Sequence, residues 1–247
     1  RKTIRIRSDK LDGLLNLVGE LVTVQAQLSQ TVRDSTDRHL HGISDYVKRL
    51  AGELRATSME LRLVPVESLF SKFKRLARDL SKNLGKEFEI RFEGGDTEID
   101  KSVIDVLNDP LVHLVRNAAD HGLESPEERA ALKKPRCGTI TMKAQHAGAF
   151  VRISVADDGH GLNREKILKK AVDRGLVQPD AKLSEEEIDQ LIFKPGFSTA
   201  DVISNVSGRG VGLDVVKTAI DQLGGTLNVK SRIGHGTEFC LDIPLTL

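Results

Sequence analysis

The chain has 247 residues, of which 39% are hydrophobic and 30% charged, and its 37 Lys and Arg residues against 36 Asp and Glu residues give a formal net charge of +1. This balance is typical of a folded protein with a core of its own and excludes a disordered chain. The near-neutral charge and the absence of Trp argue against nucleic acid as a partner, and without an apolar run of roughly 18 residues we expect no direct membrane insertion and a cytoplasmic location.

The first 64 residues predict a helical hairpin. Apolar side chains recur every three or four positions, which is the spacing of one helix face, at Leu11, Leu14, Leu15, Val18, Leu21, Val22 and Leu28. After a polar stretch at 35–39, the same spacing returns from Ile43 to Leu61. A short hairpin has little apolar area to bury within itself, so we expect two copies to form a dimeric four-helix bundle. The alternative is that both stripes pack on the rest of the chain.

Pro65 marks the predicted boundary between a dimerisation domain, residues 1–64, and a second domain, residues 65–247. Proline supplies no backbone N–H and disfavours helical geometry in the residue before it. The elements expected beyond it are, in chain order, a helix over 66–84, a strand over 88–92, two helices of which the second begins at Pro110, strands over 139–144 and 150–156, helices over 163–172 and 184–192, a helix over 211–223, and strands over 226–231 and 237–245. This order predicts an α+β fold with helices over one face of a mixed sheet.

Two polar clusters are candidates for a ligand site. His113, Asn117 and His121 follow one another at helical spacing beside an apolar stripe. The sequence DDGHG at 157–161 directly follows a strand. Its glycines would let a flat ligand approach the backbone while a carboxylate accepts a hydrogen bond from an amino group. Taken alone, the first cluster is also typical of a polar helix surface and the second of a turn.

Two further clusters indicate a lid and an anion site. The segment FKPGFST and the residues after it, 193–206, have little periodicity and are typical of a mobile lid. The sequence SGRGVGL at 207–213 runs directly into a helix, where backbone N–H groups and the helix dipole favour an anion. It is not a Walker A loop, since no Lys follows the last Gly, and its spacing differs from the dinucleotide-binding GxGxxG.

In this order, the four clusters resemble the Bergerat-fold ATP-binding superfamily of histidine kinases, Hsp90, type II topoisomerases and mismatch-repair ATPases. Five segments are similar to the CheA family of chemotaxis histidine kinases: KLDGLLNLVGELV, HLVRNAADHGLE, FKPGFST, SGRGVGLDVVK and GTEFCLDIPLTL. The resemblance covers essentially the whole chain. It implies an antiparallel helical hairpin followed by a Bergerat-fold α/β sandwich with a mixed sheet.

The resemblance also implies which residues would bind ATP and Mg²⁺. Asp157 would accept the adenine amino group, with Gly159 and Gly161 giving the base room and Thr237 near the same water network. Asn117 would bind Mg²⁺ through its side-chain oxygen, which is a hard ligand for a hard cation.

The same resemblance places a second group of residues near the phosphates. His113 is a candidate base for the incoming nucleophile, and His121, Lys166 and Lys170 would lie near the triphosphate. The loop that would wrap the phosphates as the lid closes contributes Ser207, Gly208, Gly210, Val211 and Gly212.

The reaction implied is transfer of the ATP γ-phosphoryl group to a histidine on a separate phosphotransfer domain. His39 and His41 do not fit the phosphoacceptor box of sensor kinases, and we interpret them as solvated turn residues. The phosphoaccepting domain and the domain that binds a CheW-type coupling protein are expected outside this sequence, which we interpret as a fragment. Response regulators and chemoreceptors would be partners of the full-length protein, in association with membrane receptor arrays.

Two other functions are alternatives to the histidine kinase hypothesis. An ATP hydrolase of the Hsp90 or topoisomerase kind would need a glutamate in the Asn-bearing helix, and the residue four positions before Asn117 is His113, which favours phosphoryl transfer. A dimeric scaffold could retain the nucleotide fold without turnover. The presence of Asp157, Asn117 and the glycine-rich loop argues against such a loss of catalytic activity.

Overall fold

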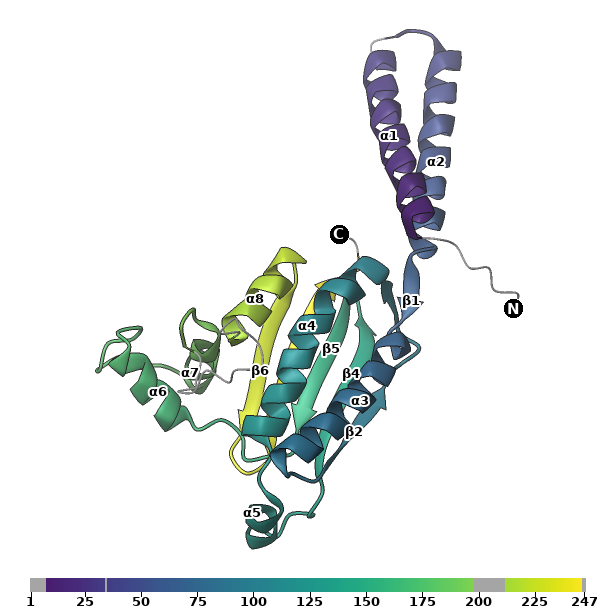
Figure 1. Cartoon of the computed structure of the whole chain (residues 1–247). Helices are drawn as coiled ribbons and strands as arrows, with labels where there is room; N and C mark the ends of the chain where they lie inside the picture. Colours follow the sequence, from purple (N-terminus) through teal and green to yellow (C-terminus); the bar gives the residue numbers. More distant parts are fainter. Residues whose placement is uncertain (1–7, 34, 198–211, 246–247) are drawn as a thin grey trace. The chain divides into compact units, whose positions relative to one another are not determined.

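The computed structural model describes residues 8–33, 35–197 and 212–245, and it divides into two compact units, residues 1–64 and 65–247, which are treated separately below (Figure 1). No helix among the described residues is both long enough and apolar enough to cross a membrane.

The first unit is a hairpin of α1 (Ser8–Val32) and α2 (Arg38–Glu60). Asp37 caps α2, because its carboxylate accepts hydrogen bonds from the backbone N–H groups of His39 and Leu40. The interpretation of His39 and His41 as turn residues is therefore wrong. Both lie in the first turn of α2, and Nε2 of half-buried His41 lies 2.8 Å from the carbonyl oxygen of Ser35.

Most of the apolar stripes remain uncovered within this hairpin. Among its described residues, the buried apolar side chains are Val18, Val32 and Ala51. Large apolar side chains stay exposed on both helices, at Leu14, Leu17, Leu21, Val24, Leu40, Ile43, Tyr46, Leu50, Leu54, Met59 and Leu61. Large apolar side chains exposed along both helices are a feature of helices that pack on a further partner.

The second unit is built on a five-stranded sheet. Its strands, in spatial order, are β2 (Phe88–Glu93), β4 (Gly138–Ala147), β5 (Phe150–Asp157), β7 (Gly236–Pro244) and β6 (Thr226–Arg232). The pair β2 and β4 is parallel and the other pairs are antiparallel, so the predicted mixed sheet is confirmed. Two short strands complete the chain's β-structure among the described residues, β1 (Leu63–Pro65) and β3 (Glu98–Asp100).

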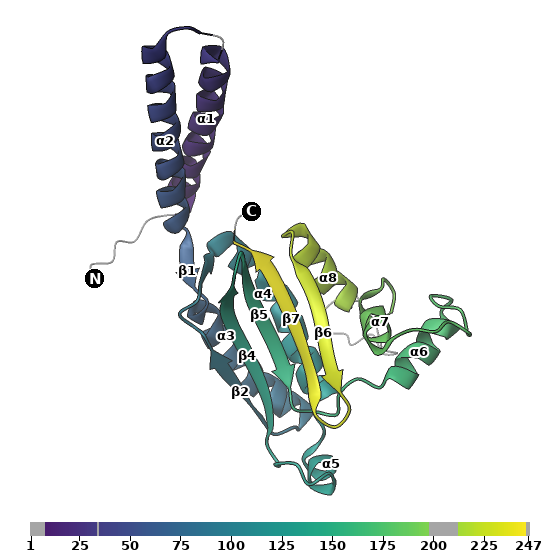
Figure 2. The same cartoon turned by 180° about the vertical axis from the view of Figure 1, so that it is seen from behind.

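Three helices cover one face of this sheet, namely α3 (Glu67–Leu84), α4 (Lys101–Asn117) and α8 (Leu213–Gln222). Figure 2 shows the opposite face, over which none of the described helices lies. The core lies between these layers, where Leu111 and Leu114 of α4 and Ile140, Ile153 and Ile243 of the strands are all buried. Full burial of each such side chain stabilises the fold by about 1.5–3 kcal/mol. Their combined burial stabilises the packing of the helices on the sheet.

The remaining helices are α5 (Pro126–Ala131), α6 (Arg164–Asp173) and α7 (Glu185–Gln190). The predicted caps of α6 and α7 are confirmed, since Asn163 accepts from the N–H of Lys166 and Ser184 forms a capping box with Glu187. α5 was not predicted from the sequence.

The prediction that Pro110 opens a new helix is wrong. α4 runs from Lys101 to Asn117 without a break, and Pro110 is buried inside it. Proline removes one helical hydrogen bond. Here Leu107 and Leu111 on either side of Pro110 are completely buried, and the burial of this continuous apolar stripe offsets the lost bond.

Candidate functional site

Asp157, the last residue of β5, has a buried carboxylate. Its side chain accepts hydrogen bonds from the backbone N–H groups of Gly159, at 2.9 Å, and of Thr237. Burial raises the pKa of Asp157 to about 6, because desolvation of the carboxylate outweighs the two hydrogen bonds that lower it. Asp157 is thus ionised at neutral pH but easily protonated, and it is seated at the ends of β5 and β7.

Glycines pack closely around this carboxylate. A Cβ on Gly122 would lie 2.9 Å from Cγ of Asp157, and a Cβ on Gly159 would collide with the carbonyl of Gly122. Gly161 has a φ of +76°, and a Cβ there would lie 2.5 Å from the carbonyl oxygen of Arg232. The sequence predicted that Gly159 and Gly161 leave room for a ligand. The structure shows that they also allow three backbone segments to meet at Asp157.

The helix that carries Asn117 ends beside the same loop. α4 ends at Asn117 and continues as a π-helical turn, η1 (Ala118–Gly122), which packs on β5 and β7. The carbonyl of Gly122 accepts a hydrogen bond of 3.1 Å from the N–H of His160. Because a π-turn has more residues per turn than an α-helix, the expected α-helical face through His121 does not extend past Asn117.

His113 of α4 lies near the first turn of α8. Burial lowers the pKa of half-buried His113, the charges of Arg116 and His121 lower it further, and the carboxylate of Asp214 in α8 opposes them. Uncharged His113 is therefore the main form at neutral pH. His121 is exposed, with Nε2 3.7 Å from Oδ2 of Asp120.

Gly212 is the buried N-cap residue of α8. The first turn of α8 thus lies close to His113, as an anion site beside the Asn-bearing helix requires. Four other predicted phosphate-loop residues lie outside the described residues: Ser207, Gly208, Gly210 and Val211.

The predicted lid is fixed at its start. Leu191–Phe193 form a 3-10 turn, η2, and Phe193 and Phe197 are both buried. Phe193 contacts Phe239 of β7 edge to face, with ring centroids 6.2 Å apart. The beginning of the segment is therefore anchored in the core, and the remainder, 198–206, lies outside the described residues.

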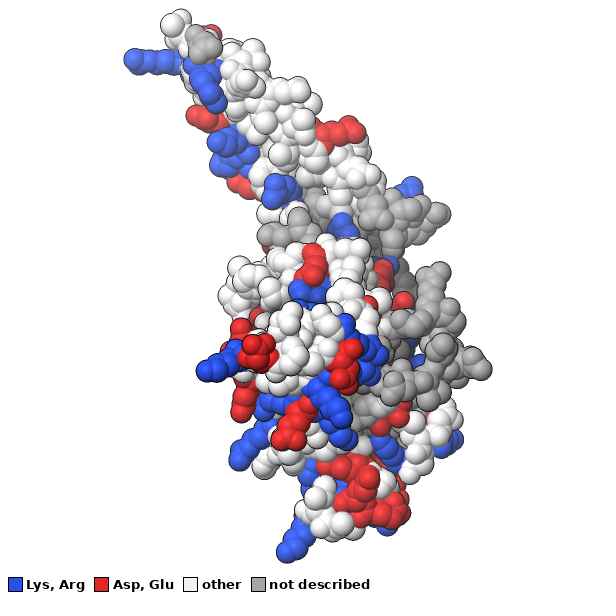
Figure 3. Space-filling model, turned by 90° about the vertical axis from the view of Figure 1, so that its left-hand side faces the viewer, with Lys and Arg blue, Asp and Glu red and all other residues white. Residues whose placement is uncertain are grey.

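Lys166 and Lys170 lie on α6, whose neighbours are α7 and η2. Lys166 is exposed and Lys170 half-buried. Figure 3 shows the side of the molecule that carries α6, where positive and negative side chains are interspersed. The assignment of both lysines to the triphosphate stays a prediction.

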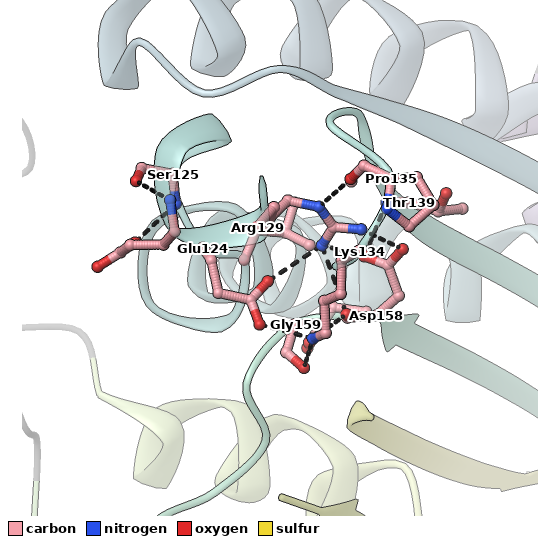
Figure 4. Close-up of polar contacts among 12 residues, drawn as sticks. Glu124, Ser125, Arg129, Lys134, Pro135, Thr139, Asp158 and Gly159 are labelled. Atoms are coloured by element: carbon pink, nitrogen blue, oxygen red, sulfur yellow. Dashed lines mark hydrogen bonds and ion pairs between the residues drawn. The ribbon is translucent and has the colours of Figure 1, made fainter. Parts of the chain in front are cut away.

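Sequence reasoning missed an ion cluster beside the loop 157–161, in which Arg129 and Glu124 are buried while Lys134 and Asp158 are partly exposed. It consists of Arg129, Glu124, Lys134 and Asp158 (Figure 4). The one local signal was the capping box of Ser125 with Glu128 and Pro126 between them, which starts α5 and so places Arg129. That the guanidinium would be buried could not be read from the spacing of charges.

The comparisons with known proteins agree with these features. A family model described as histidine kinase-, DNA gyrase B-, and HSP90-like ATPase matches residues 107–247, and one described as signal transducing histidine kinase, homodimeric domain, matches residues 1–61. The chain is 48% identical over 248 residues to the chemotaxis protein CheA of Bacillus subtilis (strain 168), covering 100% of this chain and 37% of that protein.

It is also 47% identical over 248 residues to the chemotaxis protein CheA of Rhizobium meliloti (strain 1021), covering 99% of this chain and 33% of that protein. The chain thus spans about a third of the length of these relatives. Among solved structures, the catalytic domain of histidine kinase ThkA is 20% identical with a TM-score of 0.48, covering 74% of this chain and 94% of that one.

Proposed function

The chain belongs to the CheA family of chemotaxis histidine kinases, and we propose that it holds the dimerisation and ATP-binding catalytic domains of such a kinase. Residues 1–64 would form the homodimer, and residues 65–247 would transfer the γ-phosphoryl group of ATP to a histidine on a separate phosphotransfer domain. The observation that carries this proposal is the buried carboxylate of Asp157, held by two backbone N–H groups beside the end of the Asn117 helix.

In this proposal Asp157 recognises the adenine base. An ionised carboxylate accepts a hydrogen bond from the exocyclic amino group, and charge assistance makes such a bond stronger than one between neutral partners. Burial of Asp157 to 8% exposure keeps water from competing for that acceptor. Gly159 and Gly161 hold the loop close to its neighbours, so the carboxylate has a fixed direction when the base arrives.

The residues present fit a Mg²⁺ ion carried in with the nucleotide. Among the described residues no group of three His, Cys, Asp or Glu side chains could hold a metal ion by itself. A nucleotide-bound Mg²⁺ takes its ligands from phosphates, waters and one or two protein oxygens, and the amide oxygen of Asn117 would be such a ligand. The bound ion would neutralise charge on the transferring group.

His113 and α8 would act on the phosphate side. Because burial lowers the pKa of His113, its uncharged imidazole could take the proton that the acceptor imidazole releases as its nitrogen–phosphorus bond forms and ADP leaves. The first turn of α8 after Gly212 would stabilise the negative charge of the phosphates through its unpaired N–H groups.

The hairpin supports dimer formation through its exposed apolar stripes. Leu17, Val24 and Tyr46 keep 64%, 60% and 54% of their surface exposed, and packing two hairpins would cover them. The partners of the full-length protein would be response regulators, chemoreceptors and a CheW-type coupling protein, at a cytoplasmic site associated with receptor arrays.

The direct test mixes the chain with Mg²⁺, γ-labelled ATP and a separately prepared histidine-phosphotransfer domain. We expect label on the acceptor that is stable in base and lost in acid, as phosphohistidine is. The Asp157→Asn variant should give much less label at the same ATP concentration, because it binds ATP more weakly. Release of free phosphate with an unlabelled acceptor would favour an ATP hydrolase, and ADP binding without either product would favour a scaffold.

A further inference from the structure

The ion cluster beside the loop 157–161 has two cations that bind Asp158 and Gly159 of this loop. The first is Arg129 of α5, whose side chain is 1% exposed. Its Nη1 donates to Oδ1 and its Nη2 to Oδ2 of Asp158, both at 2.9 Å. Nη1 also donates to Oε2 of Glu124 at 3.0 Å, and Nε donates to the carbonyl of Pro135 at 2.6 Å. The guanidinium is thus used in its bidentate, planar form, as Figure 4 shows.

The second cation is Lys134, which binds the backbone of the loop itself. Its Nζ donates to the carbonyl oxygens of Asp158, at 2.9 Å, and Gly159, at 2.7 Å. It also contacts Oε1 of Glu124 at 2.6 Å. Lys133 directly before it has a φ of +58°, a left-handed conformation that a lysine adopts only at an energetic cost. The turn that this conformation makes brings the chain from α5 back to the loop.

The cluster separates two neighbouring carboxylates. Asp158 is fixed by Arg129 and by the N–H of Thr139, which donates to its Oδ1 at 3.0 Å. Asp157 is left with the N–H groups of Gly159 and Thr237. Because Arg129 binds the Asp158 side chain and Lys134 binds the carbonyl oxygens of Asp158 and Gly159, the backbone directly after Asp157 is restrained.

A purely structural role is a weak explanation for this arrangement. Buried ion pairs often add nothing to stability compared with apolar side chains of the same volume, because desolvation offsets the attraction. Here two cations and two carboxylates balance in charge. Their combined hydrogen bonds converge on residues 158 and 159, next to the residue proposed to bind adenine.

We propose that Arg129 and Lys134 are positioning residues that set the direction of the Asp157 carboxylate, so that adenine recognition depends on a cluster that does not itself touch the nucleotide. This inference rests on the proposed function, in which Asp157 accepts the adenine amino group. The inference predicts that substitutions in the cluster reduce the selectivity for adenine and do not only reduce the stability of the fold.

The test compares binding of ADP with binding of purine riboside diphosphate, which lacks the amino group, in the whole chain by calorimetry. The variants are Arg129→Lys, which keeps the charge but loses the bidentate fork, and Lys134→Met. The matched control is Arg152→Lys on β5, where a second bidentate pair binds Asp242 at 2.6 and 2.8 Å away from the loop. Thermal unfolding without nucleotide measures the fold of each variant.

We expect both cluster variants to bind ADP roughly tenfold more weakly, since one charge-assisted hydrogen bond is misdirected. Their affinity for purine riboside diphosphate should change much less, so the ratio of the two affinities should fall. KM for ATP should rise with kcat little changed. Arg152→Lys should leave the ratio unchanged whatever it does to the unfolding temperature. Folded cluster variants that keep the ratio of the wild type overturn the inference. A wild type without any preference for ADP overturns the adenine role of Asp157 instead.

Discussion

Protonation of Asp157 should control nucleotide affinity in mildly acidic solution. Its pKa is raised to about 6 by burial, and in the proposed function the ionised carboxylate is the stronger acceptor for the adenine amino group. With that pKa, about nine tenths of the free protein is ionised at pH 7 and about one tenth at pH 5. The affinity for adenine ligands should therefore fall about tenfold across these two pH units, with the affinity lost as pH falls.

Calorimetric titrations from pH 5 to pH 8 would measure this loss. ADP itself changes its phosphate ionisation in the range, so adenosine serves as a second ligand without phosphates. Asp157→Asn provides the matched control, because an amide cannot titrate there. Affinities that stay flat to pH 5 for both ligands, or curves that run parallel in wild type and variant, would refute the reasoning.

The same raised pKa has an opposite consequence for stability. A carboxyl group that binds its proton more tightly in the folded state stabilises the fold below its ordinary pKa, and this stabilisation is lost as pH rises through about 6. The difference from the ordinary value of 3.8 corresponds to about 3 kcal/mol at neutral pH. Without nucleotide, Asp157→Asn should thus gain up to about 3 kcal/mol in unfolding free energy at pH 7.5 relative to the wild type, and the gain should vanish near pH 4. Urea unfolding at both pH values checks this; an equal difference at both would contradict it.

Three further results are expected. Asn117→Asp should lower Mg²⁺-dependent phosphoryl transfer at least tenfold while thermal unfolding changes little, and a fully active variant would remove the metal assignment. Gly122→Ala should weaken ADP binding about tenfold, because its Cβ would lie 2.9 Å from the Asp157 carboxylate, whereas Gly52→Ala, with open space around it, should not. Leu17→Glu in α1 should give monomers in sedimentation velocity, because it places a charge among the exposed apolar side chains of the hairpin. Leu132→Glu, at an exposed position in the second unit, should leave the dimer intact. A dimeric Leu17→Glu variant would contradict the assignment of these side chains to the dimer interface.

The elements that could be predicted from the sequence are those fixed by local chemistry. Gly85 ends α3 in the left-handed conformation, and Asn163 and Ser184 satisfy the first N–H groups of their helices. Each of these depends on a few adjacent residues. The alternation of apolar residues in β5 likewise needs only one buried face.

The errors came where tertiary burial overrides such local rules. Pro110 is a helix breaker by its own geometry, yet the apolar stripe on both sides of it is buried on the sheet, which local propensity does not include. α5 is only six residues long, too short for a periodic pattern. The π-turn after Asn117 likewise depends on the packing of η1 against β5 and β7.

The pair Asp157 and Asp158 shows why the candidate site could be predicted only in part. By local chemistry the two residues are alike, and only the resemblance to a known family distinguishes Asp157 from Asp158 in the sequence. Asp157 is left with two backbone N–H groups and a raised pKa, whereas Asp158 receives a guanidinium 29 residues away in the sequence. Since that guanidinium is placed by α5 and the turn at Lys133, the different hydrogen-bond partners of the two carboxylates could not be predicted from the residues next to them.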